Sequence, residues 1–199
     1  MKIGLTGSIA CGKSTVSSYL RTLGCAVVDA DAISRSMTAP GGPALPAIRE
    51  AFGDSVFAED GTLDRRMLGS VVFSDPLKRA RLNAILHPMI IGEILHELHE
   101  ADHDGHIVFG DIPLLYECGL ERHFDQVWVV SASRETQITR LLERDGLARP
   151  DAEKRIDSQM PLAQKESLAD AVISTEGTIE QTQAHVLRLL TPWLERRQA

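Results

Sequence analysis

The sequence has few cysteines, few aromatic residues and no long apolar run. Its 3 cysteines form no paired motif and are odd in number, which argues against a disulfide framework and favours a reducing compartment. No apolar run approaches the roughly 20 residues that cross a bilayer. The short run at the N-terminus ends in a glycine-rich turn and is too short for the core of a signal peptide. We therefore expect a cytoplasmic protein that has no membrane partner.

The sequence also has no excess of positive charge. Lys and Arg total 21 against 28 Asp and Glu, which gives a formal net charge of −7. Because nucleic acids favour clustered basic residues, this balance argues against a nucleic-acid partner but leaves room for a small anionic ligand. Of the basic residues 16 are arginines, which fits either codon usage in a GC-rich genome or a need for phosphate-binding guanidinium groups.

The pattern that is present alternates strands and helices. An apolar run at 2–5, a helical pattern at 13–23 and a second run at 25–28 form a βαβ unit, which implies a parallel sheet. Further strands are predicted at 106–109, 126–130 and 171–174, and helices at 133–144 and 178–197, where Pro192 kinks or ends the last one. We therefore predict a single α/β domain over 1–199 with a five-stranded parallel sheet.

Two helical segments interrupt this pattern. Residues from about 32 to 104 hold no comparable strand, and helices are predicted there at 45–52, 64–73 and 76–102, the last broken near His87-Pro88. A second helical stretch covers about 133–168. Because ligands bind at the carboxyl ends of parallel strands, both insertions are placed to contribute to a site.

The motif G-x-x-x-x-G-K-[ST] is present in full at residues 7–14. Gly7 and Gly12 permit turns that a Cβ would obstruct, and the N–H groups of the loop then face phosphate oxygens at a helix N-terminus. Lys13 is expected to reach the β- and γ-phosphates, and the Ser14 hydroxyl to ligate Mg²⁺. The predicted nucleotide-binding residues of this segment are Ala10, Cys11, Gly12, Lys13, Ser14 and Thr15.

Two residues near this motif keep two interpretations each. Cys11 either senses redox state, since a helix N-terminus lowers a thiol pKa, or simply fills the loop with a small side chain. Asp111 follows the third predicted strand and is either a Mg²⁺ ligand or a helix cap.

The remaining polar residues favour a kinase. The only asparagine, Asn83, is not part of the Asn-Lys-x-Asp segment with which guanine-specific switches read their base. Asp29 and Asp31 follow the second strand, and an acceptor hydroxyl needs one such carboxylate, although either aspartate is also suited to cap a helix. Five arginines lie in the second helical stretch, either as a cationic lid or as a solvated helix face paired with Glu143 and Glu153: Arg134, Arg140, Arg144, Arg149 and Arg155.

Several short segments, in order along the chain, resemble the dephospho-coenzyme A kinase family. They are Ile3-Gly4-Leu5-Thr6-Gly7, Val28-Asp29-Ala30-Asp31, Gly61-Thr62-Leu63-Asp64-Arg65-Arg66, the Leu86-His87-Pro88 turn, Ile112-Pro113-Leu114-Leu115-Tyr116-Glu117, and the lid residues Thr136, Gln137, Arg140, Arg144, Arg155, Ser158 and Gln159. The loop departs from the family pattern at Ser8, Ala10 and Cys11, and Asp157 departs from it in the lid.

The resemblance implies a three-layer P-loop kinase that transfers the γ-phosphate of ATP to the ribose 3′-hydroxyl of dephospho-coenzyme A. It implies that Asp31, Lys13 and Arg140 are catalytic and that Arg144 also binds the nucleotide. It assigns the acceptor to Thr6, Asp31, Arg65, His87, Pro113, Leu114 and Glu117, and Mg²⁺ to Ser14 and Asp111. We expect a monomer or weak homo-oligomer. The alternatives are a nucleoside or nucleoside-monophosphate kinase and a nucleotide sensor without catalysis.

Overall fold

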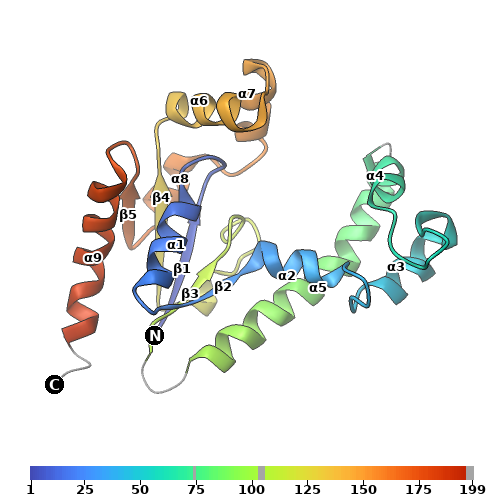
Figure 1. Ribbon diagram of the computed structural model, residues 1–199, viewed down its shortest axis with the longest axis horizontal. Helices are drawn as coiled ribbons and strands as arrows, with labels where there is room; N and C mark the ends of the chain where they lie inside the picture. The colour runs from blue at the N-terminus through green and yellow to red at the C-terminus, as the bar shows by residue number, and fades with distance from the viewer. Residues whose placement is uncertain (74, 103–105, 196–199) are drawn as a thin grey trace. The chain divides into compact units, whose positions relative to one another are not determined.

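The computed structural model describes residues 1–73, 75–102 and 106–195. The chain divides into two compact units, one formed by Met1–Val28 with Leu98–Ala199 and the other by Asp29–Glu97. The first unit carries the sheet and the phosphate loop, and the second is helical (Figure 1). Each unit is described separately below.

Five strands form one sheet in the order β2-β3-β1-β4-β5. They are β1 (Lys2–Gly7), β2 (Ala26–Asp29), β3 (Val108–Asp111), β4 (Gln126–Ser131) and β5 (Ala171–Ser174). β1 pairs in parallel with β3 and β4, and β4 in parallel with β5. The predicted five-stranded parallel sheet is therefore confirmed, with the third strand beginning and ending two residues later than predicted.

Side chains alternate between the two faces of the central strand β1. Ile3 and Leu5 point into a core shared with α1 (Lys13–Thr22) and α9 (Ile179–Glu195), which pack against each other. Gly4 points to the opposite face, where an added Cβ would lie only 2.5 Å from Leu115. The segment after β3 therefore covers that face closely, together with α8 (Leu162–Ser167), which packs on β4.

The segment between β4 and β5 begins with two helices, α6 (Arg134–Asp145) and α7 (Arg149–Asp157), which pack against each other (Figure 1). Ser133 caps α6 by accepting from the Thr136 N–H, and Gly146 ends it at φ +64°. The two helices share a small core of Ile138, Leu141, Ala152 and Ile156, against which Ile9 and Ala10 of the phosphate loop pack. The loop and these helices therefore form one packed assembly.

The second unit contains α2 (Ala30–Met37), α3 (Leu45–Phe52), α4 (Arg65–Phe73) and most of α5 (Pro76–Ala101). Helix α2 was not predicted from the sequence. It follows β2 directly, and the Asp29 carboxylate caps it by accepting from the Ala32 N–H at 2.9 Å. Short 3₁₀ turns lie at Asp54–Val56 in this unit and at Glu121–His123 in the first.

Both predictions of a helix interrupted at a proline need correction. Helix α5 runs through His87-Pro88 without a break, and α9 continues past Pro192 to Glu195. A proline removes one helical hydrogen bond and crowds the carbonyl four residues earlier. Ala84 and Pro88 are exposed, so water can solvate the carbonyl that loses its partner.

Residues 103–104 of the predicted insertion and 196–197 of the predicted last helix lie outside the described residues. Within the described ranges, no helix is both long and apolar enough to span a membrane.

Candidate active site

The phosphate loop joins β1 to α1 through a backbone that only small residues permit. Gly12 has φ +86°, and Ala10 has φ +59°, which is unusual for a residue with a Cβ. Gly7 is needed for a different reason, because an added Cβ would lie 2.6 Å from the Val130 carbonyl oxygen and 2.5 Å from Cys11 Sγ. The two glycines of the motif are therefore required by close packing at Gly7 and by left-handed backbone at Gly12.

Lys13 and Asp111 meet beside this loop. Lys13 Nζ donates to Asp111 Oδ1, and the two side chains are only 16% and 7% exposed. Asp111 is the last residue of β3 and Lys13 the first of α1, so the parallel pairing of β1 with β3 brings them together. The helix-cap interpretation of Asp111 is therefore not supported.

These residues fit a bound Mg²⁺ ion. Asp111 supplies a carboxylate at the phosphate loop, and Ser14, on the first turn of α1, supplies an exposed hydroxyl. Among the described residues no group of three or more His, Cys, Asp or Glu is placed to hold a metal. One carboxylate and one hydroxyl suit Mg²⁺, which binds to few protein groups and completes its shell with water and substrate phosphates.

Arg140 extends from α6 onto the phosphate loop. Its guanidinium donates to the Ala10 carbonyl at 3.2 Å, to Thr175 Oγ1 at 3.0 Å and to the Thr175 carbonyl at 2.8 Å. Thr175 follows β5 and donates in turn to the Cys11 carbonyl at 2.8 Å. In the part of the chain that the structure describes, Arg140 forms no ion pair, and its hydrogen-bond acceptors are neutral oxygens.

Two glutamines hold the backbone of the same loop. Gln137 Nε2 donates to the Ile9 carbonyl at 2.7 Å, and Gln159 Oε1 accepts from the Ile9 N–H at 2.9 Å and from the Ser8 hydroxyl at 3.3 Å. Both polar groups of Ile9 are thus bound by side chains of the 133–168 segment. This segment shapes the loop directly and also supplies the candidate lid arginines.

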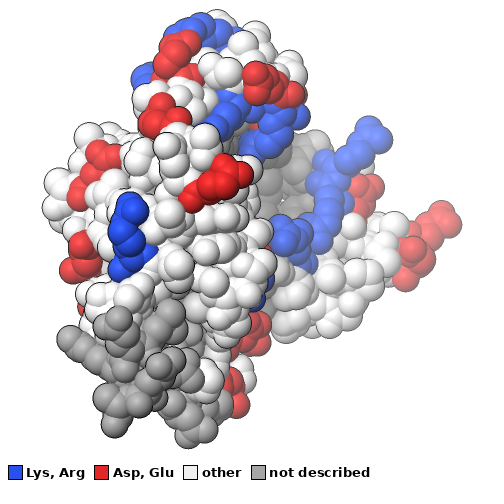
Figure 2. All heavy atoms as spheres, turned by 60° about the vertical axis from the view of Figure 1, so that its left-hand side comes forward, with Lys and Arg blue, Asp and Glu red and all other residues white. Residues whose placement is uncertain are grey.

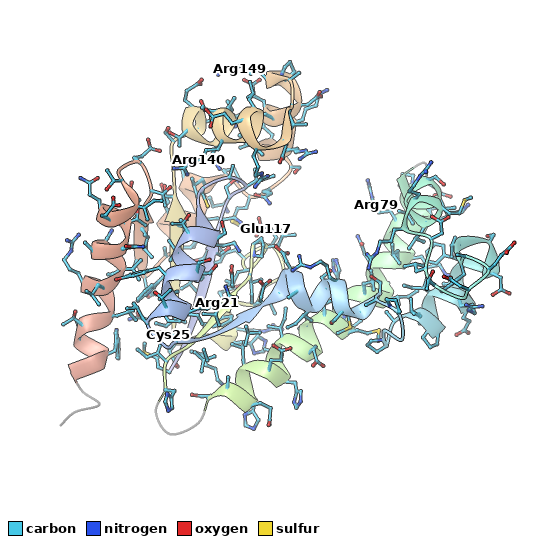
Figure 3. The ribbon with its side chains drawn as sticks, viewed as in Figure 1. Arg21, Cys25, Arg79, Glu117, Arg140 and Arg149 are labelled. Atoms are coloured by element: carbon cyan, nitrogen blue, oxygen red, sulfur yellow. The ribbon has the colours of Figure 1, made fainter. Side chains whose placement is uncertain are left out.

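The other lid arginines form ion pairs with carboxylates. Arg134 pairs with Asp157, Arg149 with Glu135 and Glu153, and Arg144 and Arg155 both with Asp145. Of the two predicted partners only Glu153 is used, and Glu143 is in no described pair. Basic and acidic atoms lie side by side over the α6–α7 pair in Figure 2, and Figure 3 shows Arg149 at its outer side and Arg140 beneath α6. Arg140 therefore differs from the other four arginines, because it binds neutral oxygens at the phosphate loop and they bind carboxylates.

The loop after β3 contains the predicted acceptor residues Pro113, Leu114 and Glu117. The Pro113 carbonyl accepts from Thr6 Oγ1 and from Lys165 Nζ, both at 3.0 Å. Glu117 forms an ion pair with Lys165 at 2.8 Å, and Leu114 is 42% exposed. The structure thus brings Thr6, Pro113 and Glu117 together next to the phosphate loop.

Three predicted site residues lie in the second unit. Asp31 is exposed on the first turn of α2, whereas Asp29 takes the capping role that the sequence left open for either aspartate. Arg65 begins α4 and donates to the Thr38 carbonyl at 3.4 Å. His87 is exposed in the middle of α5 and not in a turn.

Cys11 is fully buried and belongs to the core beneath the loop. Burial raises the pKa of its thiol, and this effect outweighs the lowering effect of the Lys13 N–H and the Lys13 charge. A neutral, inaccessible thiol is poorly suited to sense redox state. The structure therefore favours the interpretation of Cys11 as a small side chain that fills the loop.

Two residues of this site were not predicted, Thr175 and Lys165. Thr175 directly follows β5, so the rule that ligands gather at the carboxyl ends of parallel strands could have indicated it. Lys165 is in a six-residue helix where a lysine is normally solvated, yet its exposure is 0%. No local sequence pattern indicates this burial.

The parallel sheet and phosphate loop, with Lys13 and Asp111 beside the loop, define a P-loop kinase of the α/β class. Shikimate kinase from Aquifex aeolicus shares the fold, with a TM-score of 0.53 at 18% identity over 96% of each chain. A protein from Thermus thermophilus superposes with a TM-score of 0.80 at 33% identity, over 96% of this chain and 97% of that one.

The particular family follows from the sequence comparisons. The dephospho-CoA kinase family profile matches residues 1–181. The dephospho-CoA kinase of Geobacter metallireducens is 47% identical over 98% of this chain and 96% of its own, and that of Symbiobacterium thermophilum is 48% identical over 92% and 77%. The chain belongs to the dephospho-CoA kinase family. This membership confirms the predicted kinase activity and favours dephospho-CoA over a nucleoside or nucleoside monophosphate as the acceptor.

Proposed function

We propose that this protein transfers the γ-phosphate of ATP to the ribose 3′-hydroxyl of dephospho-coenzyme A, giving coenzyme A. The observation that carries the proposal is the convergence of Lys13, Asp111 and Arg140 on one phosphate loop in a member of this family. Phosphoryl transfer depends mainly on positioning and on neutralising charge. Lys13 and Arg140 supply positive charge, and Asp111 and Ser14 would hold a Mg²⁺ ion, which would add further positive charge beside the phosphates.

Asp31 takes the role of the carboxylate that orients the acceptor hydroxyl. It is an exposed carboxylate two residues after β2, and the neighbouring Asp29 is already used as the cap of α2. Arg65, His87, Thr6, Pro113 and Leu114 contact the acceptor in this proposal, and Glu117 contributes to acceptor binding by holding the 113–117 loop in place. Arg144 contacts the nucleotide after exchanging its ion pair with Asp145 for phosphate.

The same proposal extends to the setting of the enzyme. Cys11 and Cys118 are in no disulfide, which suits a reducing compartment, and we place the enzyme in the cytoplasm as a monomer or weak homo-oligomer. The small-molecule acceptor requires neither nucleic acid nor membrane.

A coupled ADP-release assay with a panel of acceptors tests the activity. Dephospho-coenzyme A is expected to give turnover well above nucleosides, nucleoside monophosphates and shikimate. Preference for one of those acceptors would reject the proposal, and absence of turnover with every acceptor would favour a sensor.

The Asp31→Asn variant tests the assigned mechanism. Loss of general-base or orienting help typically costs about 10²–10⁴-fold in rate. We expect a decrease in kcat of at least about 100-fold, with ATP affinity within about threefold of wild type, because Asp31 acts on the acceptor. Asp29→Asn serves as the control, since an asparagine also caps a helix. Unchanged kcat in Asp31→Asn would remove Asp31 from the mechanism.

A further inference from the structure

Lys165 is a buried charge to which the proposed mechanism assigns no role. It lies on α8 with 0% exposure, between the sheet and the loop after β3. An ammonium group has three donors. Here Nζ lies 2.8 Å from Glu117 Oε1, 3.0 Å from the Pro113 carbonyl and 3.4 Å from the Gly7 carbonyl. All three donors of the ammonium group therefore have an acceptor.

The three oxygens that Lys165 binds belong to two loops of the candidate site. Gly7 ends β1 and begins the phosphate loop, whereas Pro113 and Glu117 belong to the loop after β3. Glu117, labelled in Figure 3, also accepts from the Met160 N–H at 3.0 Å, within the 133–168 segment that supplies the lid arginines. Lys165 thus joins the phosphate loop to the 113–117 loop, and Glu117 joins the 113–117 loop to the 133–168 segment.

An ion pair with a fully buried lysine is weak support for a purely stabilising role, and here the Glu117 side chain keeps 23% exposure. Desolvation of the lysine charge offsets its attraction to Glu117, and apolar replacements of similar volume at buried ion pairs often stabilise as well or better. Beyond stability, an ion pair can fix the positions of the two chain segments that carry its charges. Since the bonds of Lys165 to Glu117 and Pro113 are shorter than that to Gly7, the main effect of Lys165 is expected on the 113–117 loop.

We propose that Lys165 is a positioning residue that fixes the 113–117 loop against the phosphate loop and thereby sets acceptor binding. This inference rests on the proposed function, because it assumes that the 113–117 loop contacts the acceptor. In it, Glu117 acts as the anchor of Lys165 and contributes to acceptor binding through the position of its loop.

Steady-state kinetics of Lys165→Met test the inference. Methionine keeps the length of the side chain but none of its donors. We expect the KM for dephospho-coenzyme A to rise about tenfold and the affinity for ATP to change less than about threefold, because interactions lost in binding appear in KM. Lys154→Met is the matched control, since Lys154 is exposed on α7 and its single ion pair among the described residues is with Asp151 across 3.5 Å. It is expected to behave as wild type.

The double variant Lys165→Met/Glu117→Gln separates positioning from stability. It leaves no unpaired charge at the site, so its thermal stability is expected to recover toward wild type while the KM for the acceptor stays raised. If KM recovers together with stability, Lys165 has only a structural role and the inference is wrong. This comparison decides the matter even if Lys165→Met alone folds poorly.

Hydrogen exchange provides a readout that does not depend on the acceptor. The 113–117 loop is followed by backbone bonds from the Cys118 N–H to the Leu114 carbonyl and from the Leu120 N–H to the Leu115 carbonyl, both at 3.0 Å. We expect faster exchange at Cys118 and Leu120 in the double variant than in wild type. Wild-type exchange there would overturn the inference. Absence of wild-type turnover with dephospho-coenzyme A would instead reject the proposed function, and the exchange data would still show whether Lys165 holds the loop.

Discussion

Individual side chains in this protein are used according to what surrounds them and not according to their type. Cys11 lies in a reactive loop but is buried and neutral, and Lys165 lies on a short helix but is fully enclosed. Arg140 binds neutral oxygens of the phosphate loop, whereas Arg144 four residues later pairs with a carboxylate. Because each of these outcomes depends on residues distant in sequence, residue type and spacing alone could not predict them.

Tyr116 provides a test at this scale. Among the residues that the structure describes, its hydroxyl is a buried side-chain polar atom without a hydrogen-bond partner. Burial, with smaller contributions from the charges of Asp170 and Glu121, raises its pKa to about 12. An unsatisfied buried polar group costs about 1–3 kcal/mol. We expect Tyr116→Phe to raise the free energy of unfolding by about 1 kcal/mol.

Urea unfolding of wild type and Tyr116→Phe measures this change, and Tyr19→Phe is a matched control because Tyr19 packs at the edge of the main core. A loss of stability in Tyr116→Phe would mean that the hydroxyl is hydrogen-bonded in solution.

Among the elements, strands were easier to predict than helix boundaries. Each strand is a short apolar run ending in small or polar residues, and all five were found. Helix α2 was missed because Asp29-Ala30-Asp31 was interpreted as the polar exit of a strand, although the same residues are a capping aspartate and a first helical turn. Helix α5 was divided at Pro88 because the helix-breaking rule is local, while an exposed site tolerates the lost hydrogen bond.

The ion pairs of α6 and α7 predict a pH dependence at the scale of elements. The hydrogen bond from Arg149, followed by its charge, lowers the pKa of Glu135 from its ordinary value of 4.5. A carboxyl group with a lowered pKa in the folded state stabilises that state above the unfolded pKa, and this contribution disappears as pH falls through the folded pKa. Glu135→Gln is therefore expected to melt slightly below wild type at pH 7, and this difference is expected to shrink as pH falls below the ordinary glutamate value of 4.5.

Thermal unfolding across this pH range measures the difference. Glu143→Gln is the control, because Glu143 is exposed on the same helix and joins none of the ion pairs in the described chain. A difference for Glu135→Gln that stays the same as pH falls would show that the side chain acts through packing and not through charge.

For the whole molecule, the class of fold and the nucleotide site could be predicted far better than the contacts that shape the site. The loop motif lies within 8 consecutive residues, 7–14, and the parallel order of the strands follows from the βαβ pattern. By contrast, Lys165 is 158 residues from Gly7 and Arg140 is 130 from Ala10, so only the folded chain brings them together. The membership of the family was predictable because several short segments resemble it in the right order along the chain.

Nucleotide binding gives the last prediction, because a ligand that binds only the folded chain stabilises the whole of it. At an ATP concentration of 100 times Kd the gain is about 2.7 kcal/mol, which for a chain of this size raises Tm by about 5–10 °C. In the proposed site Lys13 contacts the β- and γ-phosphates and Asp111 holds Mg²⁺. The shift is therefore expected to shrink when EDTA removes the metal and to be small in Lys13→Met.

AMP, which lacks both phosphates, serves as the ligand control. Each Tm shift is measured against the same protein without nucleotide, because Lys13→Met also leaves Asp111 without its partner and lowers the baseline. Equal shifts with ATP and AMP, or a full ATP shift in Lys13→Met, would mean that the nucleotide is not held through its phosphates at this loop.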